Sequence, residues 1–135
     1  RERLDHTRTF RMLSKVLRGQ AAAGGDGSDA IGELVVDRGV WEAWRDRWLA
    51  ALSGIPSATR PEEVATSMDA VNPAYIPRNH LVEEALAAAQ LGDLAPTHAL
   101  LDAVSQPFTE RPGLERYAAP APASFTDSYV TYCGT

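Results

Sequence analysis

MDAVNPAYIPRNHLVEEALAAAQLGD, residues 68–93, decides the fold, because it predicts the end of one helix, a turn and the whole of the next helix. Pro73 lacks a backbone N–H and pushes Asn72 out of the α region, so the preceding helix should end there. Pro77 can occupy the first turn of a new helix. The apolar residues that follow recur at helical spacing and form one face, made of Leu81, Val82, Ala85, Leu86 and Ala89.

The end of this stretch predicts a helical hairpin. Gly92 suits the C-terminal cap of the helix, and Asp93 is placed to N-cap a second one. Two amphipathic helices joined by so short a turn should pack antiparallel. The second helix would carry one apolar stripe, made of Leu94, Thr97, Leu101 and Val104.

Helical spacing also begins the chain, over residues 3–18. Gly19 should end that helix, and the Gly-rich residues 19–29 predict a flexible loop. Asp29 could cap a short helix running through Ile31 to Val35. The apolar face of the first helix comprises Leu4, Phe10, Leu13 and Leu17, widened by Met12 and Val16.

The strongest amphipathic pattern follows Gly39, where Trp41, Trp44, Trp48 and Leu52 recur at helical spacing. We expect this helix to pack into the core. Core packing is favoured over a ligand platform for these rings, although part of the face could dock on another domain.

A further helix should follow the break at Gly54 and Pro56. Pro61 marks its start, with Glu62 and Glu63 in the first turn. Its apolar stripe would comprise Val64, Met68 and Val71.

Four prolines interrupt residues 107–135, at positions 107, 112, 120 and 122, so this tail should be extended or irregular. No segment sustains the alternation of a strand over more than four residues. The sequence therefore predicts an all-α fold, a small bundle of about five helices over residues 1–106 followed by a Pro-rich tail.

Composition narrows the class of protein. The chain has 135 residues, 44% of them hydrophobic, which suffices for one modest core. Its net charge of −5 and its scattered basic residues argue against nucleic acid and anionic membranes as partners. No apolar run approaches the ~20 residues that span a bilayer. The single Cys is compatible with a reducing compartment, and we expect a cytoplasmic protein.

Few residues suggest chemistry. The Gly-rich residues 24–27 lack the preceding strand and adjacent Lys of a phosphate loop. His80 with Glu84, and His98 with Asp102, could each present two metal ligands, but no further ligand is indicated. We therefore predict no catalytic, cofactor-binding or metal-binding residue in this chain.

Arg78 and Asn79 follow a Pro-constrained turn at the start of a helix, where Asn can cap backbone N–H groups and Arg can reach carboxylates or carbonyls. They should lock the turn that contains Asn72 and Pro73 against the next helix. Alternatively, Arg78 contacts a domain outside this chain. With Asp93, these residues form the predicted structural or interdomain set.

An ordered series of motifs resembles the C-terminal part of the SelO/YdiU family of kinase-fold protein adenylyltransferases. The matching features are Asp5–Arg11, a Trp-containing helix, Met68–Pro73, Arg78–Asn79, Gly92–Asp93, Pro107–Phe108 and a tail with Cys133 near its end. The resemblance implies that a longer protein transfers AMP from ATP, with magnesium, to Ser, Thr or Tyr hydroxyls of proteins. The kinase-like machinery is not recognisable here, so an N-terminal catalytic domain would be missing and this segment would support it.

The resemblance also singles out Cys133, since some members carry a redox-active Cys or selenocysteine near the terminus. Their second Cys, three residues earlier, is Val130 in this chain. A disulfide would therefore need a partner thiol elsewhere. The other interpretation of Cys133 is an inert thiol on a frayed terminus.

The expected partners are the protein's own kinase-like domain and its protein substrates, and apolar surface exposed by separation from that domain would permit a dimer. Two other classes stay open. A free-standing helical adaptor would bind peptides through the hairpin of residues 83–104, although the pattern does not recur at a fixed period. A small metal-dependent enzyme would require bound metal.

Overall fold

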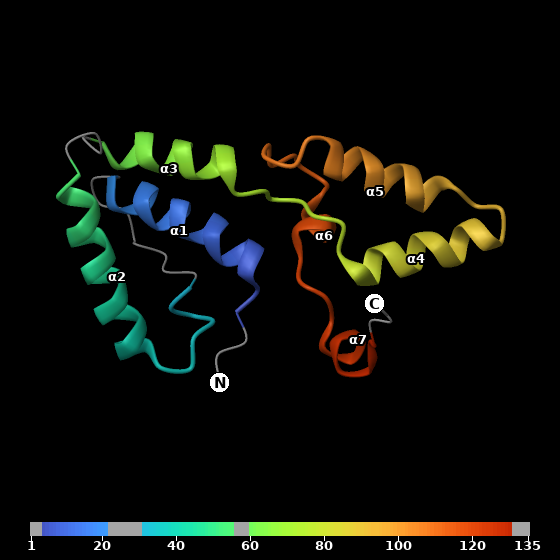
Figure 1. The fold of residues 1–135 in the computed structure, drawn as a ribbon, viewed down its shortest axis with the longest axis horizontal. Coiled ribbons are helices and arrows are strands. Elements are labelled where there is room, and N and C mark those ends of the chain that lie inside the picture. Colours follow the sequence, from blue (N-terminus) through green and yellow to red (C-terminus); the bar gives the residue numbers. More distant parts are fainter. Residues whose placement is uncertain (1–3, 22–30, 56–59, 131–135) are drawn as a thin grey trace, which may run out of the picture. The chain divides into compact units, whose positions relative to one another are not determined.

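The computed structural model describes residues 4–21, 31–55 and 60–130. These ranges contain seven helices and no strand, which confirms the all-α prediction (Figure 1). No helix among them has both the length and the apolarity needed to cross a bilayer. The helices are α1 (His6–Ala21), α2 (Arg38–Ser53), α3 (Pro61–Val71), α4 (Asn79–Gln90), α5 (Ala95–Ser105), α6 (Glu115–Ala118) and α7 (Ala123–Ser128).

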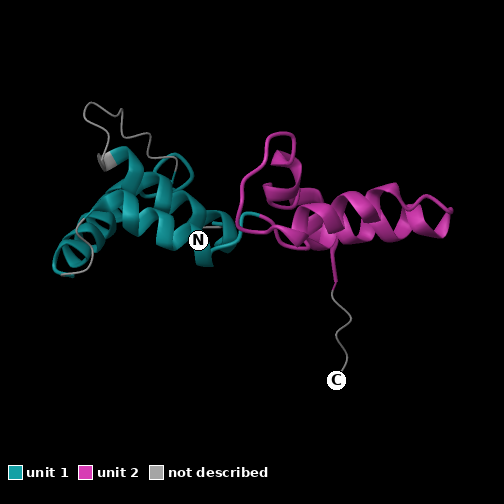
Figure 2. Ribbon diagram, turned by 90° about the horizontal axis from the view of Figure 1, so that it is seen from above, with its two compact units in different colours: residues 1–74 teal, residues 75–135 magenta. Residues whose placement is uncertain are grey.

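Two compact units make up the chain, unit 1 from Arg1 to Ala74 and unit 2 from Tyr75 to Thr135 (Figure 2). The described part of the tail belongs to unit 2, because it packs on α4 and α5 through the contacts of Tyr75, Arg78 and Glu84. The boundary predicted after residue 106, between the helical domain and the tail, stays a prediction.

In unit 1, α1 and α3 lie side by side and antiparallel (Figure 1). Asp5 caps α1 by accepting the Arg8 N–H at 2.8 Å. The helix continues through Gly19 to Ala21, so the predicted end at Gly19 is wrong. One Gly costs a helix only about 1 kcal/mol, and packing of the preceding turn offsets that. The core comprises Met12, Leu13, Val16, Ile31 and Trp41, with Leu4, Val35, Trp48 and Met68 against it.

The segment after Ile31 forms a single turn rather than the short helix expected there. The Ile31 carbonyl accepts the N–H groups of Leu34 and Val35 at 2.9 and 3.1 Å. Ile31 itself is fully buried, and this fixes the turn on the core. Asp29 and most of the predicted loop of residues 19–29 lie outside the described residues.

Asp37 is the N-cap of helix α2, and its side chain accepts the Val40 N–H at 3.1 Å. The rings of Trp41, Trp44 and Trp48 stack in a ladder, with centroids 5.4 and 5.7 Å apart. Only Trp41 is buried, whereas Trp44 is 40% exposed. The prediction that the Trp face packs into the core is therefore correct for one edge of that face.

Helix α3 starts at Pro61 with Glu62 and Glu63 in its first turn, and ends at Asn72, all as predicted. Its expected apolar stripe is only partly correct, because Met68 packs on the core. Ala65 is fully buried, but Val71 is 72% exposed. The face towards α1 runs through Ala65, Asp69 and Asn72 at helical spacing, and this turns Val71 away from it.

In unit 2, α4 and α5 form the predicted antiparallel hairpin (Figure 1). Gly92 has a φ of 86°, the left-handed conformation expected after a helix. Asp93 Oδ1 accepts the Ala95 N–H at 2.9 Å. Helix α4 begins at Asn79, so Pro77 precedes it instead of lying in its first turn.

The expected apolar stripe of α5 is correct for Val104, which packs on the core of unit 2, and is otherwise displaced by one residue. Leu94 and Leu101 are 51% and 62% exposed, whereas Leu100 and Ala103 are buried. Both stripes have helical spacing, and packing on α4 selects the second. The core of unit 2 is Leu81, Ala85 and Leu100, with Val82, Val104 and Tyr117 packed around it.

The tail is less irregular than its prolines predicted. It contains two short helices, α6 between Pro112 and Pro120, and α7 directly after Pro122. Pro120 and Pro122 separate them, as expected of residues that cannot continue a helix.

Candidate functional site

The main polar site of unit 1 is the Asp69 cluster, made of Asp69, Arg11, Ser14, Arg18 and Glu62. Ser14 is fully buried and donates its hydroxyl to Asp69 Oδ1 at 2.6 Å. Arg11 Nη1 lies 3.1 Å from Asp69 Oδ1, and Arg18 Nη1 lies 2.7 Å from Oδ2. Arg18 also reaches Glu62 at 3.0 Å. Both carboxylate oxygens of Asp69 are therefore engaged by α1.

The surrounding hydrogen bonds and charges of this cluster stabilise the charged form of Asp69. Burial alone would raise the pKa of Asp69, but the hydrogen bonds from Ser14 and Arg18 and the charge of Arg11 lower it below 3.8. The hydrogen bond to Asp69 likewise raises the pKa of Arg18. The arrangement is a clamp between two helices, in which both oxygens of the Asp69 carboxylate are paired.

Asn72 completes this clamp. Its carbonyl accepts Arg11 Nη1 at 3.3 Å, and its side chain donates to the Met68 carbonyl at 2.8 Å. The structure thus places Asn72 and Pro73 where α3 ends against α1. A contact of these two residues with another domain stays a prediction.

Arg78 and Asn79 have different surroundings. Arg78 is only 8% exposed and its Nη2 donates to the Ala118 carbonyl at 3.1 Å, so it fastens the end of α6 to the start of α4. Asn79 is exposed in the first turn of α4. The expected lock at the start of α4 therefore acts on the tail. An interdomain role for Arg78, Asn79 or Asp93 stays a prediction.

Tyr75 and Arg111 form a second tie to the tail that the sequence did not indicate. The Arg111 N–H donates to the Tyr75 hydroxyl at 2.7 Å, and the Tyr75 N–H donates to the Pro107 carbonyl at 3.3 Å. The Arg111 guanidinium bonds the Asp102 carboxylate at 3.0 Å and the Asp102 carbonyl at 2.7 Å. Only the adjacency of Arg111 to Pro112 could have suggested a fixed turn here.

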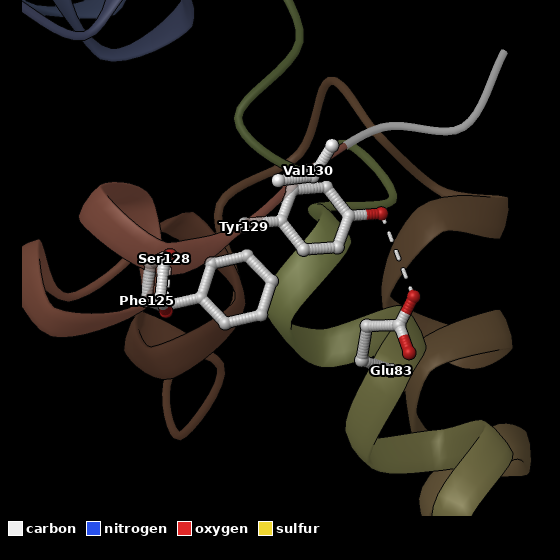
Figure 3. Close-up of a pocket in the computed structure, with 5 residues that line it drawn as sticks. All are labelled: Glu83, Phe125, Ser128, Tyr129 and Val130. Atoms are coloured by element: carbon white, nitrogen blue, oxygen red, sulfur yellow. Dashed lines mark hydrogen bonds between the residues drawn. The ribbon is translucent and has the colours of Figure 1, made fainter.

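An open groove of about 680 Å³ lies between α4 and α7 (Figure 3). Phe125 stacks on Tyr129 with ring centroids 4.6 Å apart, and the Tyr129 hydroxyl lies 3.5 Å from Glu83 Oε1. His80 meets the edge of Phe125. Burial, followed by the charges of Arg78 and Arg116, lowers the pKa of His80. The remaining lining residues are Ser128 and Val130.

The described ranges hold no group of three or more His, Cys, Asp or Glu side chains that could bind a metal ion. Of the two pairs considered from sequence, Glu84 is bound by Arg116 and Asp102 by Arg111. Each carboxylate thus already has a cationic partner. Cys133, the predicted redox residue, lies outside the described residues.

Comparison with known proteins identifies relatives over almost the whole chain. No family model matches the sequence. Curated proteins named protein nucleotidyltransferase YdiU are 48% identical in Pseudarthrobacter chlorophenolicus and 51% identical in Mycolicibacterium paratuberculosis, each over 98% of this chain. A YdiU protein of Cereibacter sphaeroides is 45% identical over 99% of the chain.

The aligned region is a minor part of each relative. It spans 23% of the Pseudarthrobacter protein and 24% of the other two. The motifs that indicate the family in the sequence therefore lie within the aligned region. In each relative, this region is part of a much longer polypeptide. The chain belongs to the YdiU/SelO family and corresponds to a C-terminal domain of its members.

Proposed function

We propose that this chain is the accessory helical domain of a protein adenylyltransferase. The complete protein transfers AMP from ATP to Ser, Thr or Tyr hydroxyls of protein substrates, and the transfer takes place in a kinase-like domain that this chain lacks. The observation that carries the proposal is the identity of 48–51% over 98% of the chain to proteins named nucleotidyltransferases. ATP and magnesium are cofactors of that catalytic domain.

The contacts within each unit support an accessory role. The most buried charged groups, Arg11 and Arg78, bond to carboxylates or carbonyls of neighbouring helices. Paired groups of this kind hold helices in place, because each of these buried charges already has a partner. A domain built this way supports a catalytic partner through its shape and surface.

The same proposal covers regulation and location. Cys133 acts as a redox-sensitive thiol whose disulfide partner lies elsewhere in the full-length protein or in another molecule. The protein functions in the cytoplasm, where a lone Cys stays reduced until oxidants appear. Its partners are its own kinase-like domain and the proteins it modifies.

Intact-mass spectrometry of the full-length protein tests the proposal. The protein is incubated with ATP, magnesium and a substrate protein, beside a version that lacks residues 1–135. We expect the mass of the substrate protein to increase by one AMP unit with the complete protein, and to increase more slowly with the truncated one. Equal rates of AMP transfer by the two proteins, with both folded, would exclude the accessory role. No increase in mass with either protein would exclude the adenylyltransferase activity itself.

A Cys133→Ser variant tests the regulatory part separately. The rate of AMP transfer is measured in reduced and oxidised samples of the wild type and the variant. The wild type should respond to oxidation and the variant should not. An identical response in both proteins would exclude Cys133 as the switch.

A further inference from the structure

The apolar face of α2 is wider than the part that unit 1 buries. Trp41, Trp48 and Leu52 recur at i, i+7 and i+11 and are buried or half-buried. Beside them runs a second stripe, Val40, Trp44 and Ala51, at i, i+4 and i+11. We call this second stripe the Trp44 edge. All three of its residues are exposed.

Exposure separates the two stripes clearly. Trp41 is 7% exposed, against 40% for Trp44 and 67% for Val40. The stacked rings keep Trp44 in a fixed position on the ladder, 5.4 Å from Trp41 and 5.7 Å from Trp48. A rigid, partly exposed Trp loses little conformational entropy on binding, which is why Trp is enriched at the energetic centres of protein interfaces.

Two ion pairs occupy polar sides of α2. Arg38 bonds Glu42 at 2.9 Å, and Arg45 bonds Asp46 at 3.0 Å. By helical spacing, both pairs lie away from the Trp44 edge. The Trp44 edge is thus the side of α2 whose burial against another surface would be most favourable.

We propose that the Trp44 edge is where unit 1 docks on the part of its own polypeptide that lies outside residues 1–135. The relatives are about four times longer than the chain, since it spans 23–24% of their length, so most of such a polypeptide lies outside residues 1–135. Intramolecular docking also benefits from a high effective concentration. This inference rests on the proposed accessory function and names the surface that carries it.

Site-specific photocrosslinking in the full-length protein tests the docking. The probe p-benzoylphenylalanine replaces Trp44, because its aromatic side chain preserves much of the ring surface. The matched control places the same probe at Asp46, which is exposed on the other side of the same helix. After irradiation, the crosslinked peptides are identified by mass spectrometry.

The expected result is several-fold more crosslinking from position 44 than from position 46, to a peptide outside residues 1–135. Crosslinks within residues 1–135, crosslinks between two copies, or equal yields at both positions would overturn the proposal. A circular dichroism spectrum of each probe-containing protein checks that it is folded. The expected crosslinks, together with unchanged AMP transfer after removal of residues 1–135, would support the docking surface and exclude the accessory function. Slower AMP transfer after that removal, without the expected crosslinks, would support the accessory function and exclude this docking surface.

Discussion

The Ser14 hydroxyl donates to Asp69 Oδ1 at 2.6 Å, across the interface between α1 and α3. Ser14 also contacts the Arg11 carbonyl at 2.9 Å through the same hydroxyl oxygen, and it is completely buried. Short hydrogen bonds to a charged acceptor are roughly twice as strong as neutral ones. This pair therefore ties the two helices together at a position where the Ser14 side chain has no access to water.

Replacing Asp69 with Asn should destabilise the chain by about 1–3 kcal/mol, because Arg11 and Arg18 would lose their common carboxylate while Arg11 stays buried. Urea denaturation followed by circular dichroism measures this free energy. Glu42→Gln is the control, since Glu42 forms an exposed pair with Arg38 whose loss costs about 0.5 kcal/mol or less. Equal effects of both substitutions would contradict the clamp.

The Asp69 cluster should also set an acid limit on stability. The folded pKa of Asp69 is lowered, so its stabilising contribution is complete above the unfolded value of about 3.8 and is lost as the pH falls through the folded pKa. The stability difference between wild type and Asp69→Asn should therefore shrink below pH 4 and stay constant above pH 5. Denaturation at a series of pH values tests this, and a difference independent of pH would refute it.

Protonation of His80 should affect stability at a higher pH than protonation of Asp69 does. Its pKa is lowered from 6.5 by burial and by nearby Arg78 and Arg116, so the unfolded chain binds the proton more readily than the folded one. Acidification from pH 6.5 towards the folded pKa should destabilise unit 2, and below that pKa the loss is complete. His80→Gln should flatten this slope, whereas the same change at His98, exposed on α5, should leave it intact. Denaturation curves between pH 5 and 7.5 provide the measurement.

Tyr75→Phe removes the acceptor for the Arg111 N–H and should cost about 1–2 kcal/mol. The Arg111 amide should then exchange with deuterium faster, because its bond to the tyrosine hydroxyl is lost. Tyr117→Phe serves as the control, since its ring packs on the α4–α5 core and remains after the change. Unchanged exchange at Arg111 in Tyr75→Phe would show that this bond does not hold the tail.

Two glycines should respond to Ala in opposite directions. Gly92 has a φ of 86°, so Gly92→Ala should destabilise the hairpin by about 1 kcal/mol even though the added Cβ meets no atom within 4 Å. Gly39 lies in the first turn of α2 with ordinary helical geometry, and its Cβ would meet only Asp37 Oδ1 at 3.5 Å. Gly39→Ala should therefore be neutral or stabilising, by up to about 1 kcal/mol. Thermal melts of the two variants decide the matter, and a loss of stability in both would argue against it.

Local features were predictable because they depend on residues close together in the chain. Pro61, Gly92 and Asp93 act within one turn of their own position, through a missing N–H, a positive φ and a short side chain. The helices they delimit could therefore be predicted with most of their boundaries. The end of α1 could not be predicted from Gly19, because the contacts that keep α1 helical come from elsewhere in unit 1.

Which face of each helix is buried could not be predicted as well. The sequence of α5 supports a stripe through Leu101 and another through Leu100, and only the contact with α4 decides between them. The same holds for the Asp69 cluster, where Ser14 and Asp69 are 55 residues apart. A polar pair at that separation leaves no periodic pattern, so the main candidate site emerged only from the structure.

The division after Ala74 means that one short stretch serves both units. Asp69 and Asn72 hold α1 in unit 1, whereas Tyr75 and Arg78 hold the tail in unit 2, and only Pro73 and Ala74 separate the two pairs. A substitution or insertion here would disturb two sets of contacts at once. Among homologous proteins, residues 69–78 should therefore tolerate fewer changes of sequence or length than either unit does on average.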